Sequence, residues 1–113
     1  MEAANAELLR QGLRGFGLDC DEASIAAIVR HLKLVAEWNE RVNLTAVTAE
    51  REMVLKHALD SASLLSVVPL EPGSRVLDVG TGAGFPGITL KCLVPGIDLV
   101  LLDLKIGKAN GLE

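Results

Sequence analysis

A carboxylate and a run of glycines are the residues of this chain best suited to chemistry. Asp78 stands within the apolar stretch Val76–Val79, and Gly80, Gly82 and Gly84 follow it directly. Glycine adopts backbone angles that are costly for other residues, and a turn without side chains lets a ligand approach the main-chain amides. The pattern predicts a loop that binds a nucleotide-type cofactor, although glycines in this arrangement also occur in ordinary tight turns.

A second carboxylate, Asp103, closes the next apolar stretch, which begins at Ile97. In dinucleotide-binding folds, the acid that binds the ribose follows the glycines at a similar distance. A carboxylate at Asp78 would oppose a pyrophosphate but favour a cation, such as the sulfonium and ammonium groups of S-adenosylmethionine. Asp103 can accept hydrogen bonds from both hydroxyls of a ribose. These residues favour S-adenosylmethionine over NAD.

The elements that must position these residues form one β-α-β unit. The branched apolar side chains of Val76–Val79 are typical of a strand buried on both faces of a parallel sheet. Pro86 suits the first turn of a helix, which we expect to run from Gly87 to about Leu93 and to stop at Pro95–Gly96. A second strand over Ile97–Asp103 completes the unit.

The chain before this unit has a helical pattern. We expect one helix from about Glu2 to Leu13, ended by Gly15 and Gly17, and a longer one over Asp21–Arg41. Its apolar residues recur at helical spacing and predict one buried face: Ile25, Ile28, Val29, Leu32, Val35 and Ala36.

A third helix is predicted to start at an N-cap on Thr48 and to run toward Leu65. Prolines and a glycine at Pro69, Pro72 and Gly73 then interrupt the chain. We therefore expect a helical region over residues 1–70 and an α/β region over residues 71–113.

Composition limits the function classes. The chain has 113 residues, 50% of them hydrophobic, which supports one modest domain. With 11 basic and 15 acidic residues its net charge is −4, so tight binding of a polyanion by this chain alone is not expected. Cys20 and Cys92 have no metal-binding or redox spacing and are predicted to be free thiols. With no membrane-spanning run and no signal peptide expected, we predict a cytoplasmic protein.

Three segments in this order resemble one family: EWNERVNLTAV at Glu37–Val47, HALDSASLL at His57–Leu65 and LDVGTGAGFPGITL at Leu77–Leu90. They are similar to the bacterial 16S rRNA guanine-N7 methyltransferases, also called the glucose-inhibited division protein B family. The residues that match the family pattern are Trp38, Asn39, Asn43, Leu44, Thr45, His57, Asp60, Ser61 and Asp78 to Gly87. The resemblance covers roughly Ile25–Asp103.

The resemblance implies an S-adenosylmethionine-dependent rRNA methyltransferase of the α/β class. An N-terminal helical cap would precede the first β-α-β unit of a Rossmann-like fold, and 16S rRNA in the small ribosomal subunit would be the partner. The implied cofactor-binding residues are Asp78, Gly80, Thr81, Gly82, Gly84, Phe85 and Asp103. No catalytic side chain and no metal are implied, because guanine N7 has a lone pair and no proton, so positioning dominates.

Other matched residues have two interpretations. His57 and Asp60 lie near the cleft in the family, but their spacing also suits a hydrogen-bonded pair on a helix surface. We expect Trp38, Asn39 and the segment Asn43–Thr45 to be structural. The charged residues between Glu37 and Lys56 are expected on a solvated face: Glu40, Arg41, Arg51 and Glu52.

The chain departs from the family after Asp103. It is roughly half the family's length, and Gly107 and Gly111 fall where a helix is expected. Two parallel strands alone leave an open sheet edge and an uncovered apolar face. Two hypotheses follow: the N-terminal half of a methyltransferase that is inactive alone, or a non-catalytic truncated fragment or interaction module. An NAD-binding fragment is a third, and the sequence carries no signal for the oligomeric state.

Overall fold

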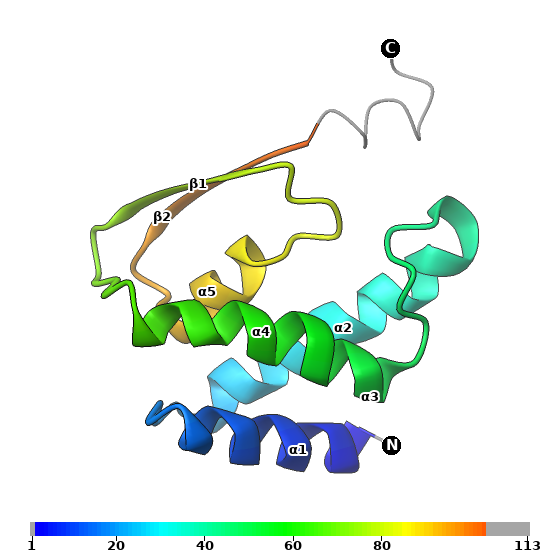
Figure 1. Ribbon diagram of the computed structural model, residues 1–113, viewed down its shortest axis with the longest axis horizontal. Coiled ribbons are helices and arrows are strands. Elements are labelled where there is room, and N and C mark those ends of the chain that lie inside the picture. The colour runs from blue at the N-terminus through cyan, green and yellow to red at the C-terminus, as the bar shows by residue number, and fades with distance from the viewer. Residues whose placement is uncertain (1, 104–113) are drawn as a thin grey trace.

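The computed structural model describes residues 2–103, so Gly107 and Gly111 lie outside the described residues. It is a helix-rich α/β structure with a two-stranded sheet. In chain order the elements are α1 (Glu2–Gly15), α2 (Glu22–Val42), α3 (Glu50–Met53), the π-helix η1 (Val54–Ala58), α4 (Leu59–Ala62), the 3-10 helix η2 (Ser63–Ser66), β1 (Arg75–Val79), α5 (Gly87–Leu93) and β2 (Asp98–Leu102). The sheet lies along one side of the molecule and α1 along the opposite side, with α2, α4 and α5 between them (Figure 1).

The long helix α2 begins and ends on polar side chains, close to where the sequence predicts. The Asp21 side chain accepts a hydrogen bond from the Ser24 amide at 2.9 Å and forms the N-cap. Asn43 takes the left-handed conformation at the other end, and its N–H donates to the Asn39 carbonyl. The predicted apolar face is buried at Ile25, Ile28, Leu32 and Val35.

The third helical segment differs from its prediction at its start and in its middle. It begins at Glu50, and its N-cap is Ala49, which makes no side-chain capping bond. The predicted cap on Thr48 is therefore wrong, because Thr48 stands one residue too early to receive the first free amides. The segment then continues without a break from α3 through η1, α4 and η2 to Ser66.

The π turn η1 has a clear cause in the packing of this segment. At the end of η1 the Leu59 amide donates to the Val54 carbonyl, five residues earlier. Met53 and Ala58 are both buried and lie five residues apart, and the same is true of Val54 and Leu59. In a regular α-helix, position 57 would follow Met53 onto the core face. The wider turn keeps the apolar residues inside and leaves His57 outside the core.

The core lies where α1, α2 and the third helical segment meet. Its buried members are Leu9, Leu13, Ile25, Ile28, Leu32, Val35, Met53, Val54, Ala58, Leu59 and Ala62. Four residues from the glycine loop and α5 pack against this cluster: Ala83, Phe85, Cys92 and Leu93. Helix α5 thereby fixes the glycine loop against α2 and α4. Both cysteines are free, as predicted, and both are half-buried.

Strands β1 and β2 are parallel, with Asp78 opposite Leu101 and Val79 opposite Leu102. The expectation of burial on both faces is wrong for the described residues, because α5 covers only the face that carries Val76. The other face is apolar and exposed, at 61% for Leu77, 68% for Val79, 57% for Val100 and 49% for Leu102. This is the uncovered apolar face expected for a sheet of two strands.

The predicted solvated positions Glu40, Arg41, Arg51 and Glu52 are all exposed. Trp38 was expected to pack but is 51% exposed, with the Arg41 guanidinium 5.5 Å from its ring centre. Within residues 2–103, no helix is both long enough and apolar enough to cross a bilayer.

Candidate cofactor-binding site

The glycine loop between β1 and α5 has the backbone conformation that its sequence predicts. Gly80, Gly82 and Gly84 have positive φ angles of 73°, 58° and 101°. The amides of Gly80 and Thr81 donate to the Leu102 carbonyl at 2.7 and 3.3 Å. The loop therefore starts at the carboxyl end of the sheet and is held there by the last residue of β2.

The glycines serve two different purposes. A Cβ built on Gly80 would have no heavy atom within 4 Å, and one on Gly82 would meet only Asp103 Oδ2, at 3.8 Å. A Cβ on Gly84 would lie 2.3 Å from Ile88 Cδ1 and 3.2 Å from His31 Nε2. The first two glycines thus leave the loop open to a ligand, whereas Gly84 permits close packing on α2 and α5.

Asp78 organises the inner side of the loop. Its Oδ2 atom accepts hydrogen bonds from the Thr81 hydroxyl at 2.7 Å and from the Gly87 amide at 2.9 Å. Thr81 is buried and Asp78 is half-buried. The carboxylate therefore joins the end of β1, the first turn of the loop and the first amide of α5, a position that also suits negative charge because helix N-termini are electropositive.

Asp103 holds the loop from the other strand. It follows β2 directly, and its Oδ2 atom accepts a hydrogen bond from the Gly82 amide. Asp78 and Asp103 thus hold the same short loop from the ends of neighbouring parallel strands. The structure brings the predicted residues Asp78, Gly80, Thr81, Gly82 and Asp103 together.

Phe85 does not lie with these residues; its ring lies between two imidazole rings. Its ring centre is 4.8 Å from that of His31 on α2 and 4.7 Å from that of His57 on η1. The His57 ring is stacked on it with an interplanar angle of 22°. His31 Nε2 lies 2.8 Å from the Ala83 carbonyl oxygen. The rings fix the far side of the loop to the helical region.

A hydrogen-bonded chain supports His57 from behind. Its Nε2 atom lies 2.8 Å from Thr45 Oγ1. The Thr45 amide donates to the side-chain oxygen of buried Asn39 at 2.8 Å, and the Val47 amide donates to Thr45 Oγ1 at 3.1 Å. The predicted structural role of Asn39 is confirmed, and Thr45 also positions His57. Of the two interpretations of His57, the structure favours the one next to the loop.

Burial controls the charge of both imidazoles. It lowers the pKa of His31, against the smaller opposing effect of the Ala83 carbonyl. It also lowers the pKa of His57, where the Asp60 carboxylate opposes it. Both rings are therefore neutral at neutral pH. A neutral His31 donates from Nε2 to Ala83, which leaves Nδ1 as a buried nitrogen without a hydrogen-bond partner.

No local sequence pattern places His31 at the loop. It lies within α2 among residues of a helical apolar pattern, and its partner Ala83 is 52 positions away. Thr45 matches the family pattern, but nothing in its sequence spacing from His57 predicts the contact between the two side chains. Contacts of this kind depend on tertiary packing, which local patterns do not encode.

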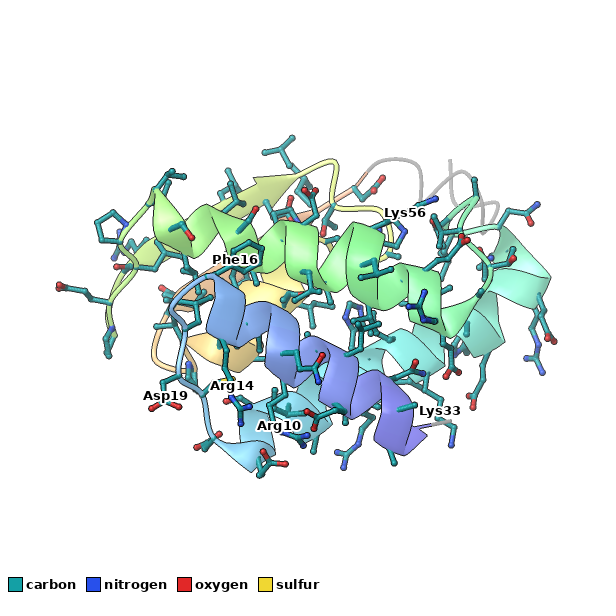
Figure 2. All side chains as sticks on the ribbon, turned by 60° about the horizontal axis from the view of Figure 1, so that its bottom comes forward. Arg10, Arg14, Phe16, Asp19, Lys33 and Lys56 are labelled. Carbon is teal, nitrogen blue, oxygen red and sulfur yellow. The ribbon has the colours of Figure 1, made fainter. Side chains whose placement is uncertain are left out.

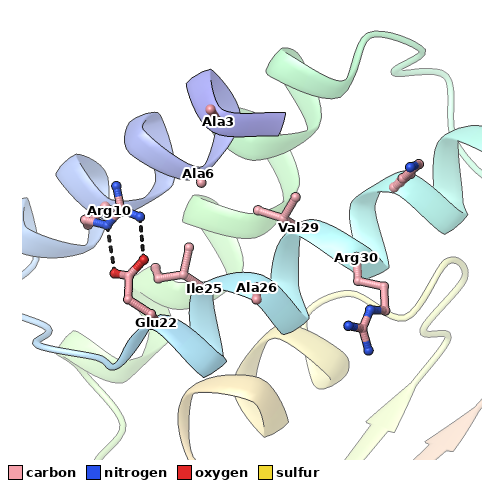
Figure 3. A pocket seen from close by; sticks show the side chains of 9 residues that line it. Ala3, Ala6, Arg10, Glu22, Ile25, Ala26, Val29 and Arg30 are labelled. Carbon is pink, nitrogen blue, oxygen red and sulfur yellow. Dashed lines mark hydrogen bonds and ion pairs between the residues drawn. The ribbon is translucent and has the colours of Figure 1, made fainter. Parts of the chain in front are cut away.

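A concavity of about 490 Å³ lies away from this loop, between α1 and α2. Its floor is apolar and includes Ala6, Ile25 and Val29 (Figure 3). At its end Arg10 donates to Glu22 at 3.0 and 2.7 Å, which holds the pKa of Glu22 below its ordinary value. This ion pair joins α1 to α2, so the groove is a helix–helix junction.

A smaller concavity of about 360 Å³ lies beside the glycine loop, between Phe85–Pro86 and the segment from Lys56 to Leu64. Among the described residues, no group of three or more acidic, histidine or cysteine side chains is arranged to hold a metal ion. Of the predicted cofactor residues, Phe85 lines this concavity, whereas Asp78 lines another one of about 230 Å³, together with Val76, Leu77, Pro86 and Gly87.

Comparison with known proteins agrees with the motifs. Residues 24–113 match the family described as rRNA small subunit methyltransferase G. The chain is 59% identical over 96 residues to ribosomal RNA small subunit methyltransferase G of Symbiobacterium thermophilum, covering 85% of this chain and 39% of that protein. The protein of the same name from Caldanaerobacter subterraneus subsp. tengcongensis is 41% identical over 113 residues, which is 100% of this chain and 47% of the relative.

A third relative of that name, from Nitrosococcus oceani, is 39% identical over 110 residues, covering 97% of this chain and 50% of the relative. The chain thus spans about half the length of the curated relatives it matches, or less. The family match includes the glycine loop, both carboxylates and the segment that carries His57. From these matches and the site geometry, the chain belongs to the rRNA small subunit methyltransferase G family.

Proposed function

We propose that this chain carries the helical cap and the first β-α-β unit of a Rossmann-like methyltransferase that uses S-adenosylmethionine. The observation that carries the proposal is the arrangement of Asp78 and Asp103. Both carboxylates hold one short loop from neighbouring parallel strands, and that loop is open at Gly80 and Gly82. Nucleoside cofactors bind at this edge of parallel sheets.

Each predicted residue then has a role. Gly80 and Gly82 have no side chains, so they leave room for the cofactor beside the loop backbone. Asp103 accepts hydrogen bonds from the ribose hydroxyls, and Asp78 supplies negative charge for the cationic end. Thr81 orients the Asp78 carboxylate through its hydroxyl.

The last two predicted residues act through the shape of the loop. Gly84 permits the tight turn over Ile88 and His31, and Phe85 fixes the loop between the two imidazoles. When bound, S-adenosylmethionine supplies an electrophilic methyl group.

We further propose that the acceptor of the complete enzyme is N7 of a guanine in 16S rRNA of the small ribosomal subunit, in the cytoplasm. The N7 lone pair carries no proton, so the reaction needs no general base. The chain's own contribution is to hold the reactants in line and to place carboxylates near the developing positive charge. No side chain among the described residues is assigned as a nucleophile.

A second hypothesis concerns the chain by itself: a non-catalytic fragment that binds the cofactor weakly or acts as an interaction module. The exposed face made by Leu77, Val79, Val100 and Leu102 favours it, because an uncovered apolar sheet face needs a partner. We expect the isolated chain to transfer no labelled methyl groups to small ribosomal subunits. Incorporation above a no-enzyme blank would contradict this expectation.

Calorimetric titration with S-adenosylmethionine tests the cofactor site. We expect saturable heat for the unaltered chain and none for Gly82→Val, whose side chain would project toward Asp103. Gly17→Val is the matched control, because Gly17 also has a positive φ angle, of 75°, and no neighbour within 4 Å, but lies outside the loop.

The control variant should bind as the unaltered chain does, and NAD should give no heat. Absence of S-adenosylmethionine binding to the unaltered chain would reject an autonomous cofactor site. Equal losses in Gly82→Val and Gly17→Val would assign the effect to backbone strain.

A further inference from the structure

His31 stands on the side of α2 that contacts the glycine loop. It follows Ile28 by three residues and precedes Val35 by four, and both of these side chains are buried. Lys33, two residues along, lies on another side of the helix, at the groove against α1 (Figure 2). An imidazole therefore occupies a position at which the helical pattern predicts an aliphatic side chain.

The His31 ring is neutral, and only one of its nitrogens is hydrogen-bonded. Burial lowers the pKa of the ring, and Nδ1 is a buried atom without a partner among the described residues. A buried polar atom without a partner costs free energy, and an aliphatic side chain of similar size would avoid that cost. What the imidazole adds at this position is the N–H at Nε2, which lies 2.8 Å from the Ala83 carbonyl oxygen.

Ala83 lies at the tip of the loop, between two glycines with positive φ angles, Gly82 and Gly84. Glycine loses more conformational freedom on folding than any other residue, so the shape of this tip depends on groups that hold it from outside. The Gly82 amide is held by Asp103, which follows β2, and the Ala83 carbonyl is held by His31 of α2. The sheet and the helical region thus each hold one peptide group of the tip.

The imidazole of His31 also packs against the two residues that follow Ala83. A Cβ built on Gly84 would lie 3.2 Å from His31 Nε2, so the ring lies directly against the loop backbone. The ring centre of Phe85 is 4.8 Å from that of His31. Loss of the imidazole would therefore release the Ala83 carbonyl and loosen the turn at Gly84 together.

We propose that His31 is a positioning residue of the cofactor site. Through the Ala83 carbonyl it holds the loop in the shape that leaves Gly80 and Gly82 open, and it thereby ties cofactor affinity to the packing of α2. The inference rests on the proposed function for the identity of the ligand. Because linkage is reciprocal, binding of S-adenosylmethionine stabilises the contact between His31 and the loop in turn.

Two variants of His31 separate its hydrogen bond from its packing. The side-chain amide of His31→Gln can donate to the Ala83 carbonyl, whereas His31→Met fills similar space without a donor. Ile25→Val is the matched control. It removes one methyl group from the buried face of the same helix, at the groove against α1, and so weakens packing away from the loop. Far-UV circular dichroism checks that all three variants fold.

Amide hydrogen exchange of the complete 113-residue chain, followed by NMR, reports on the loop without any cofactor. The amides of Gly84 and Phe85 donate to the Thr81 carbonyl at 3.0 and 3.2 Å. We expect His31→Met to speed their exchange by about three- to tenfold relative to the amides of α1. His31→Gln and Ile25→Val should leave this ratio unchanged. In the unaltered chain, imidazole ¹⁵N shifts should show His31 protonated at Nε2 and not at Nδ1.

Calorimetric titration with S-adenosylmethionine measures the effect on the ligand. We expect His31→Met to raise the Kd by about three- to tenfold, the equivalent of one lost hydrogen bond. His31→Gln and Ile25→Val should bind as the unaltered chain does. Restored affinity in His31→Gln would show that the N–H donor is required, since a purely structural role of the ring would not survive its replacement by an amide.

The proposal is overturned if the unaltered chain protonates His31 at Nδ1, if His31→Met leaves loop exchange or cofactor affinity unchanged, or if Ile25→Val or His31→Gln loses as much affinity as His31→Met. In these cases the cofactor site itself still stands, because the unaltered chain binds S-adenosylmethionine. If the unaltered chain gives no heat, the proposed function fails for the isolated chain. The exchange rates and the ¹⁵N shifts then decide by themselves whether His31 holds the loop.

Discussion

Replacing Gly87 by alanine tests how closely α5 approaches the sheet. Gly87 opens α5, and its amide donates to Asp78 Oδ2. An added Cβ would lie 2.5 Å from Leu101 Cδ2, 2.9 Å from Asp78 Oδ2 and 3.2 Å from Leu99 Cδ1. Helix α5 must therefore move away from the sheet, and the hydrogen bond to the carboxylate must lengthen.

The cost follows from three effects. Overpacking costs about 1–3 kcal/mol, and a weakened hydrogen bond to a charged group costs about 1.5–3 kcal/mol. Alanine recovers at most about 1 kcal/mol of helix propensity. We expect Gly87→Ala to lower the free energy of unfolding by about 2–4 kcal/mol, which corresponds to a fall in Tm on the order of 10 °C or more for a domain of this size.

Urea denaturation followed by far-UV circular dichroism measures this change. Gly15→Ala is the control, because Gly15 ends α1 and an added Cβ would have no neighbour within 4 Å. It should leave the free energy of unfolding unchanged or raise it slightly. A Gly87→Ala protein within about 0.5 kcal/mol of the unaltered chain would refute the close approach of α5 to Asp78.

Three further predictions concern the helical region and the sheet. Stability should fall between pH 7.5 and 5.5, because burial lowers the pKa of His31 and His57, so the unfolded chain binds more protons as the pH drops through about 6.5. A Tm that rises over this interval would contradict it, and His31→Gln should reduce the dependence. Asn39→Ala should cost about 1–3 kcal/mol in urea denaturation, because the Thr45 amide loses its acceptor in a buried site; a cost near zero would argue against that hydrogen bond. Leu77→Thr, at an exposed position, should leave Tm nearly unchanged and lower the fluorescence of a bound hydrophobic dye; a large loss of Tm would show that this face is covered.

The elements with strong local signals were predictable. Asp21 caps α2, the apolar spacing after it identifies the buried face, and the glycines mark the loop with its positive φ angles. These features depend on neighbouring residues alone. For the same reason the order helix, helix, helix, strand, helix, strand follows from the sequence, with errors of one or two residues at the ends.

The features that depend on distant contacts were not predictable. Nothing near Phe85 indicates that His31 and His57 enclose it, since the three residues come from separate segments. The π turn had no clear local signal, because Val54, Ala58 and Ala62 recur at the regular four-residue spacing and predict a helix with one regular face. The prediction that β1 is buried on both faces was wrong, because the described residues provide a covering helix on one face only.

The π turn also has a consequence for the length of the chain. Deleting Lys56 would bring Met53 and Ala58 to a regular four-residue spacing, and the core face of the helix would survive. The deletion would remove the wide turn that carries His57 to Phe85. This helix thus contains one residue more than its own packing requires. The extra residue forms the wide turn that places His57 against Phe85 of the glycine loop.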